Sequence, residues 1–141
     1  MEREKMIGLI IVLLFLAPIA YFFIFSEMLA TGEIPSYVTG EQREIYEWAK
    51  SPEGKALLEQ VPCYCGCKYE GHRHSRDCFW KDDGTFDKHG ITCSVCFDIA
   101  RKAKGMHEEG KGVCEIVKAI DDFYRPNAHL RTETPMPEGC E

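Results

Sequence analysis

Hydrophobic and polar positions divide the chain into one long apolar run and a following region of short amphipathic segments. The run covers residues 6–25, twenty positions without a charge. A helix of that length spans about 30 Å, the thickness of the hydrocarbon core of a bilayer. Because Arg3 and Lys5 precede the run and Glu27 follows it, the positive-inside rule places the N-terminus in the cytoplasm. We therefore expect residues 1–26 to form a cytoplasmic stub and one transmembrane anchor, with the remaining chain extracytoplasmic.

A cleaved signal peptide is the alternative interpretation of the same run. The apolar core of a signal peptide is usually about 7–15 residues long and ends at a site flanked by small residues. The stretch 16-LAPIA-20 contains no clean site of this kind, and apolar residues continue through Phe25. A retained anchor is therefore favoured. Pro18 is compatible with it, because membrane helices tolerate proline.

Beyond the run, helical periodicity predicts a mainly α fold with four short helices in a loop-rich Cys/His ectodomain. A linker without a sustained pattern, residues 27–39, precedes this domain, and a flexible tail, residues 127–141, follows it. The domain itself covers residues 40–126. The four helices are expected at residues 40–50, 52–61, 93–106 and 113–124.

Capping residues and apolar faces predict where these helices begin and which sides are buried. Thr39 with Gln42 resembles a capping box, Ser51 precedes a proline at the first helical position, and Thr92 is a good N-cap. The apolar positions expected in the core are Ile45, Trp48, Ala49, Leu57, Leu58, Val61, Val113, Ile116, Val117, Ile120 and Tyr124.

Eight cysteines change this picture, because a domain this small buries a marginal core and often needs disulfides or a metal. Three cysteines alternate in 62-PCYCGC-67, and an i, i+2 pair rarely reaches disulfide geometry without strain. Two more, in 93-CSVC-96, leave one helix face in its first turn, where the helix dipole favours thiolate. The spacing therefore indicates a thiolate-rich site. The cysteines expected in it are Cys63, Cys65, Cys67, Cys78, Cys93 and Cys96.

Three histidines lie among these cysteines. His72 and His74 occur in 71-GHRHSRDC-78, and His89 shortly precedes Cys93. Because imidazole nitrogens complete Cys/His metal sites, each histidine is a candidate ligand. Exposed loop histidines are equally common, and that alternative stays open for all three.

Three functions fit this site unequally. A metal-binding module accounts for the crowded thiolates, the nearby histidines and the small core. A thiol-disulfide oxidoreductase using Cys93 and Cys96 would need a thioredoxin-like βαβ setting, and no strand pattern supports one. A disulfide-stapled adaptor ectodomain is permitted by the even number of cysteines. Hydrolysis has no support, since no serine-histidine-acid or paired-carboxylate arrangement stands out. Metal binding without catalysis is the favoured interpretation.

Ligand softness narrows the choice of ion. Five or six thiolates suit Cu(I) or Zn(II), whereas Ca(II) and Mg(II) prefer carboxylates. Cu(I) is favoured and Zn(II) is the alternative, because six cysteines exceed the four ligands that one zinc ion takes. The formal charge of −6 lies wholly beyond residue 26 and argues against nucleic acid as a partner. A membrane location suggests capture, buffering or hand-over of the metal to a membrane transporter or oxidase.

The cysteine-bearing stretches also resemble a known family. The hexapeptide 62-PCYCGC-67, then 77-DCF-79, 89-HGITCSVCFDIA-100 and 116-IVKAIDDFYR-125, are similar to the bacterial PCYCGC-motif proteins. The resemblance implies a small helical domain outside the cytoplasm, anchored by a helix or a lipid, with a thiol cluster. It implies no activity.

This chain departs from the family pattern in two ways. It has a bare transmembrane run where many relatives look like lipoproteins, and Cys114 and Cys140 fall outside the motif. Cys114 lies beside the apolar stripe of the last helix, where a buried thiol is one interpretation. Cys140 lies in the tail, where we expect a free thiol or a transient metal ligand.

The orientation of the anchor generates the first prediction. A membrane-impermeant protease applied to intact cells should degrade the domain at residues 40–126, because the charges around residues 6–25 place that domain outside the cytoplasm. Immunoblotting against the C-terminal region is the measurement, with a cytoplasmic protein as the control for cell integrity. Complete protection of the domain would show that the orientation is wrong.

Overall fold

The computed structural model describes residues 16–18, 21 and 32–140, and its folded unit begins at Glu33. Most of the predicted anchor therefore lies outside the described residues. Within the described ranges, no helix is both long enough and apolar enough to cross a membrane. The orientation of the chain stays a prediction.

The first two helices of the domain match the predicted positions closely. Helix α2 covers Gly40–Lys50, and helix α3 covers Pro52–Leu58. The Ser51 hydroxyl accepts a hydrogen bond from the Gly54 N–H at 3.1 Å, which confirms the predicted cap. The capping box at Thr39 is wrong, because Thr39 makes no side-chain capping hydrogen bond. This helix start is exposed, so water can satisfy its N–H groups.

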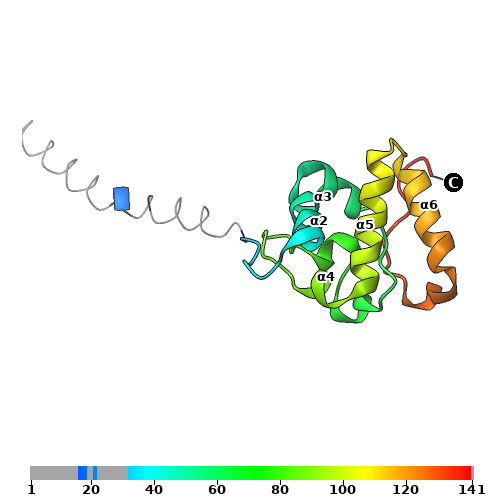
Figure 1. Cartoon of the computed structure of the whole chain (residues 1–141), viewed down its shortest axis with the longest axis horizontal. Coiled ribbons are helices and arrows are strands. Elements are labelled where there is room, and N and C mark those ends of the chain that lie inside the picture. The colour runs from blue at the N-terminus through cyan, green and yellow to red at the C-terminus, as the bar shows by residue number, and fades with distance from the viewer. Residues whose placement is uncertain (1–15, 19–20, 22–31, 141) are drawn as a thin grey trace, which may run out of the picture. The chain divides into compact units, whose positions relative to one another are not determined.

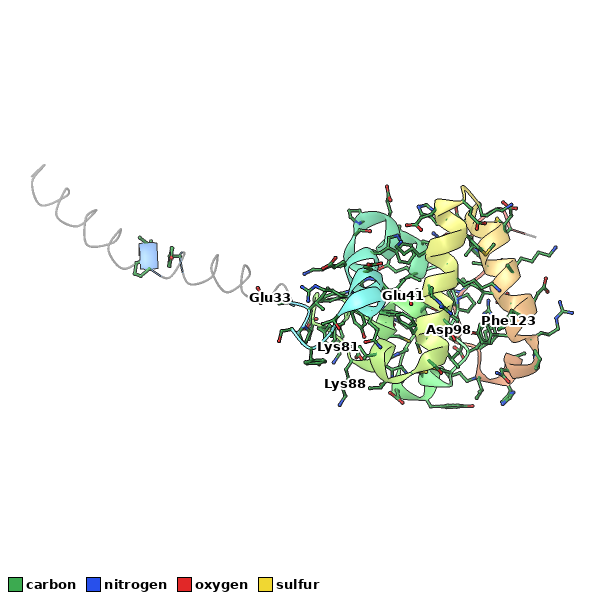
Figure 2. All side chains as sticks on the ribbon, in the orientation of Figure 1. Glu33, Glu41, Lys81, Lys88, Asp98 and Phe123 are labelled. Atoms are coloured by element: carbon green, nitrogen blue, oxygen red, sulfur yellow. A yellow bond between two sulfur atoms is a disulfide. The ribbon has the colours of Figure 1, made fainter. Side chains whose placement is uncertain are left out.

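The C-terminal half of the domain contains a helical turn and two longer helices. Helix α4 is the turn His89–Thr92, α5 covers Ser94–Glu108, and α6 covers Val113–Tyr124. Thr92 is therefore not the cap of α5. It ends α4, and Cys93 takes the N-cap position. Helices α5 and α6 lie side by side, with Asp98 and Phe123 lining one shallow cavity between them (Figures 1 and 2).

Between α3 and α4 the chain forms two 3₁₀ turns, η1 at Cys67–Glu70 and η2 at Ser75–Cys78. Among the described residues, the β pairing is a single isolated bridge between Trp80 and Phe86. The domain is therefore mainly helical, as predicted.

An aromatic cluster joins α2 to the segment after η2. The Trp80 indole N–H donates to the Tyr46 carbonyl at 2.9 Å, and the Tyr46 hydroxyl donates to the Asp87 carbonyl at 2.7 Å. Phe79 packs edge-on against Tyr46, with ring centroids 4.9 Å apart. Tyr46 was not among the predicted core positions. Of those that were, eight are buried and Trp48, Val113 and Tyr124 are partly buried.

The C-terminal segment, for which we expected little order, makes specific contacts. Residues 125–130 form the 3₁₀ turn η3, and Thr132 and Thr134 are buried. Cys114 on α6 forms a disulfide with Cys140, so neither is a free thiol. A disulfide that closes a loop of this size stabilises a domain by on the order of 3 kcal/mol.

Two glycines inside helices provide a matched test of this packing. A Cβ atom at Gly54 in α3 would lie 2.0 Å from the Trp48 carbonyl oxygen, which is backbone and cannot move aside easily. Gly54→Ala should therefore lower the free energy of unfolding by about 1–3 kcal/mol. A Cβ at Gly105 in α5 meets nothing within 4 Å. Gly105→Ala should raise the same quantity by roughly 0.5–1 kcal/mol.

Urea unfolding of the full chain in detergent, followed by circular dichroism, measures both changes. Equal effects of the two substitutions would contradict the close approach of α3 to the end of α2.

Candidate metal centre

Six cysteines of the domain are free, and five of their sulfur atoms form one continuous group. The shortest separations are 3.3 Å between Cys65 and Cys96, 3.4 Å between Cys63 and Cys96, and 3.5 Å between Cys63 and Cys65. Cys78 extends the group, with its sulfur 3.7 Å from Cys67 and 4.0 Å from Cys63. These distances exceed the length of a disulfide bond by more than an ångström, so the sulfurs are neighbours without being bonded.

The segment after α3 supplies three of these sulfurs. Gly66 has a φ of +88°, a left-handed conformation that residues with a side chain rarely adopt. The resulting turn starts η1 and directs the Cys67 N–H toward the Cys65 sulfur at 3.3 Å. The alternation of cysteines therefore places Cys65 and Cys67 on the two sides of a tight turn, and not along a straight strand.

The turn η2 delivers Cys78 to the same place. The Ser75 N–H donates to the Val61 carbonyl and its hydroxyl to the Pro62 carbonyl, both at 2.9 Å. These bonds attach η2 to the chain immediately before Cys63, so Cys78, the last residue of the turn, meets Cys63 and Cys67.

Cys93 and Cys96 come from the start of α5. Cys93 is the N-cap residue, and Cys96 lies in the first turn. Cys96 is buried and contacts the sulfurs of Cys63 and Cys65. The predicted i, i+3 pair thus faces the loop cysteines.

Two of the three predicted histidines join the cysteines. His89 Nε2 lies 3.5 Å from the Cys65 sulfur, and His72 Nδ1 lies 3.4 Å from the Cys78 sulfur. The other ring nitrogen of His89, Nδ1, lies 3.4 Å from a Glu70 carboxylate oxygen. A carboxylate on the far side of an imidazole is the usual outer partner of a metal-binding histidine, because it fixes the tautomer and the ring orientation.

His74 is the histidine that the structure keeps apart. The chain turns into η2 directly after it, and His74 Nδ1 lies 3.6 Å from Asp77 Oδ1. Burial lowers the pKa of His74, which favours the neutral ring. Its ring nitrogens belong to none of the groups of cysteine and histidine ligand atoms that lie within 4.8 Å of one another.

Ionisation of the cluster is strongly uneven. Hydrogen bonds from the thiols of Cys63 and its neighbours hold the pKa of Cys65 far below its ordinary value. The pKa values of Cys78 and Cys96 are raised, because these thiols keep their protons for hydrogen bonds to Cys63 and Cys65. The proximity of the sulfurs therefore opposes simultaneous ionisation, and a cation among them would remove that opposition.

The ionisation of the remaining ligands depends on burial and on the charge at Cys65. Burial raises the pKa of Cys93, so the helix start alone does not make it a thiolate. Burial lowers the pKa of His89, but the hydrogen bond to Cys65 and the nearby negative charges of Cys65 and Glu70 raise it by more.

The C-terminal segment holds the backbone of Cys63 through two hydrogen bonds. The Cys63 N–H donates to the Thr132 hydroxyl, and the Thr132 N–H donates to the Cys63 carbonyl, both at 2.9 Å. The Thr132 hydroxyl also lies 2.8 Å from that of Thr134, which donates to the Arg73 carbonyl at 2.7 Å. This polar chain, the Thr132 clamp, joins the two ends of the loop that carries Cys65 and Cys67.

The ligand atoms are arranged in groups of a size that suits a metal ion. Three overlapping sets have all their ligand atoms within 4.8 Å of one another, and every predicted ligand except His74 belongs to at least one. Zinc bound tetrahedrally at about 2.3 Å separates its sulfurs by about 3.8 Å. The observed separations of 3.3–4.0 Å need only small shifts to reach that value. The sets are Cys63, Cys65, Cys67 and Cys96; Cys65, His89, Cys93 and Cys96; and Cys67, His72 and Cys78.

Comparison with protein families agrees with the resemblance noted in the sequence. The model of the family described as "Protein of unknown function with PCYCGC motif" matches residues 24–137. The chain belongs to this PCYCGC family. No curated protein and no solved structure matches it.

Two features of this PCYCGC domain escaped the sequence interpretation. Glu70 was not a candidate, since a lone acid in a loop has no spacing that relates it to His89. The Thr132 clamp was missed for a similar reason, because a threonine in a polar tail gives no periodic signal. The hydroxyl groups of Thr132 and Thr134 become informative only once both side chains are known to be buried.

The clamp of the PCYCGC domain generates a prediction. Thr132→Val keeps the shape of the side chain but leaves the buried Cys63 N–H without an acceptor, which should cost about 1–3 kcal/mol of the free energy of unfolding. Thr39→Val is the matched control, since Thr39 is exposed and makes no capping hydrogen bond, and it should change stability by less than about 0.5 kcal/mol. Denaturant unfolding of metal-stripped, reduced protein measures both changes. If Thr132→Val leaves the free energy of unfolding unchanged, the Thr132 clamp does not stabilise the domain.

Proposed function

We propose that this protein binds a soft metal ion, Cu(I) or Zn(II), at the cluster of six cysteines and two histidines. The observation that carries the proposal is the convergence of all eight side chains into overlapping sets whose ligand atoms lie within 4.8 Å. Thiolate and imidazole ligands suit these ions, whereas Ca(II) and Mg(II) require oxygen ligands that the cluster does not offer.

The contrast between the disulfide and the free thiols supports metal binding. A Cys114–Cys140 bridge is typical of an oxidising compartment, which agrees with the proposed extracytoplasmic location. In such a compartment, neighbouring free thiols would be exposed to oxidation. A bound ion would keep the six thiols from pairing with one another, and it would also bring together loops that have little helix of their own.

The proposed location suggests what the bound metal is for. A domain tethered to the outer face of a membrane is positioned to capture, buffer or hand over an ion to a membrane transporter or oxidase. This part of the proposal rests on the apolar run at residues 6–25 and on the charges that flank it.

A thiol-disulfide oxidoreductase using Cys93 and Cys96 is the competing function. In that mechanism one thiol attacks a substrate disulfide and the second resolves the mixed disulfide, so the pair acts without the other cysteines. Here the Cys96 sulfur instead contacts Cys63 and Cys65. The described part of the domain also lacks the βαβ setting of thioredoxin-like proteins, since its β pairing is one bridge.

Substitution of single cysteines separates the two functions. Cys65→Ser and Cys96→Ser each remove a ligand, so both should lower the affinity for Zn(II) or Cu(I) by tenfold or more, which is at least about 1.4 kcal/mol. Metal content by elemental analysis and competition with a chromophoric chelator measures this on the full chain in detergent. The double variant Cys114→Ser and Cys140→Ser is the control. It removes two cysteines outside the cluster and should keep the metal.

Two results would contradict metal binding. One is a chain that never copurifies with or takes up a soft metal ion. The other is full metal content in Cys65→Ser together with loss of insulin-disulfide reduction in Cys96→Ser, which would establish the oxidoreductase in its place.

Metal removal tests the structural contribution of the ion. Because the ligands assemble only in the folded domain, binding energy becomes folding energy. Stripping the metal should therefore lower the midpoint of thermal unfolding, measured by circular dichroism, relative to metal-loaded protein under the same reducing conditions, in which the Cys114–Cys140 disulfide is broken in both samples. An unchanged midpoint would show that the ion does not support the fold.

A further inference from the structure

We propose that the cluster is two four-ligand sites, each of three cysteines and one histidine, which hold two divalent ions with different exchange rates. The inference rests on the proposed function, because it divides the same eight ligands between two ions of the Zn(II) type. It goes further by assigning each ligand to one ion and by giving the two ions different roles. The ion held by Cys93 is the exchangeable one, and the ion held by Cys78 is retained.

The first site, here called the Cys93 site, is complete in the structure as it stands. Its four ligand atoms all lie within 4.8 Å of one another, as one tetrahedral zinc ion requires. Its ligands are Cys65, His89, Cys93 and Cys96.

The second site, the Cys78 site, consists of the four ligands that the first leaves over. Cys67, His72 and Cys78 form one compact set. Cys63 is the fourth member, because its sulfur lies 4.0 Å from Cys78 and within 4.8 Å of Cys67. Cys63 and His72 share no set of ligand atoms within 4.8 Å, so this site closes around an ion only when these two side chains approach each other. This division uses every clustered cysteine and histidine once and gives each ion one imidazole. Six cysteines exceed the four ligands of one zinc ion, which favoured Cu(I), but with two zinc ions this excess no longer counts against zinc.

The two sites meet at Cys63. Its sulfur lies 3.4 Å from Cys96 and 3.5 Å from Cys65, both in the Cys93 site. Two dications this close repel each other, but six thiolates more than neutralise their charge. The histidines approach each other as well, with ring centroids 5.1 Å apart.

Burial distinguishes the two ions. In the Cys78 site the three cysteines are essentially inaccessible, with exposures of 0 % for Cys63, 1 % for Cys67 and 0 % for Cys78. In the Cys93 site Cys96 is buried, but Cys65, Cys93 and His89 are all half-buried, whereas His72 is the one half-buried ligand of the Cys78 site. Ligand exchange begins when an incoming ligand reaches the ion, so the half-buried site should exchange faster.

The Glu70 carboxylate belongs to the exchangeable site. It lies 3.4 Å from His89 Nδ1 and thereby directs Nε2 toward Cys65. Glu70 is mostly exposed, with 64 % of its side chain accessible. The orientation of His89 therefore depends on a contact at the surface, and its loss should weaken the Cys93 site alone by about tenfold.

Zinc loading and release test this division on the full chain in detergent. Native mass spectrometry of the protein titrated with Zn(II) should show two ions per chain. Release to a chromophoric chelator should then occur in two phases of equal amplitude. In a parallel titration with Co(II), tetrahedral absorption bands should grow until two ions are bound.

Matched histidine variants assign the phases. His89→Gln should accelerate the fast phase and leave the slow one unchanged, and Glu70→Gln should do the same more mildly. His72→Gln should accelerate the slow phase only. His107→Gln is the control, because His107 is outside both sites and faces Glu53 at 4.0 Å. Circular dichroism checks the fold of each variant. If His72→Gln does not fold, His89→Gln and Glu70→Gln still test the assignment through the fast phase.

The outcomes separate this inference from the proposed function. A chain that binds neither Zn(II) nor Cu(I) contradicts both. A chain that binds soft metal contradicts only the two-site division if it takes one zinc ion, if it takes more than two ions as a Cu(I)–thiolate cluster, or if its ions leave in one phase. Equal effects of His89→Gln on both phases would likewise overturn the division.

Discussion

The mutual repulsion of crowded thiolates is the constraint on which the rest of this structure depends. Six sulfurs lie so close together, with separations as short as 3.3 Å, that their negative charges cannot coexist without a cation or shared protons. The segment between α3 and α4 contains two single 3₁₀ turns, and it also contributes Val61, Phe79 and Trp80 to the buried core. This packing and the hydrogen bonds of the loops hold the sulfurs together, whereas negative charge on the sulfurs would force the loops apart, so the balance depends on what neutralises that charge.

The fold around the cluster places its ligands from several independent supports. Ser75 attaches η2 to Pro62, α5 presents Cys96 from its first turn, and Thr132 holds Cys63 from the C-terminal segment. Ser75 and Thr132 lie outside the cluster, whereas α5 itself carries Cys96. A site built this way has its geometry set by backbone hydrogen bonds, so that the loops do not have to be ordered by the ion alone.

The sequence predicted the helices and most of the side chains that form the cluster, because both leave periodic or spaced signals. Val113, Ile116 and Ile120 repeat at helical intervals, and the cysteines recur at i, i+2 and i, i+3. It did not predict the burial of Thr132 or the role of Glu70, since each depends on one long-range contact that has no local pattern. His74 shows the converse case, a candidate that the structure leaves outside the cluster. Its proximity to Cys78 in the chain suggested a ligand, but η2 turns it toward Asp77.

The distance along the chain between Cys63 and its clamp has a consequence for biosynthesis. Thr132 follows Cys63 by 69 residues, which corresponds to roughly 3–14 s of synthesis at about 5–20 residues per second. All six cysteines of the cluster, and Cys114, are made before Cys140, so for a time the chain carries seven thiols. If an ion occupies the cluster during that interval, Cys114 is the one partner left for Cys140 when it emerges. Early metal binding would then favour the correct disulfide, because the six cluster thiols could not pair with Cys114 before Cys140 has been synthesised.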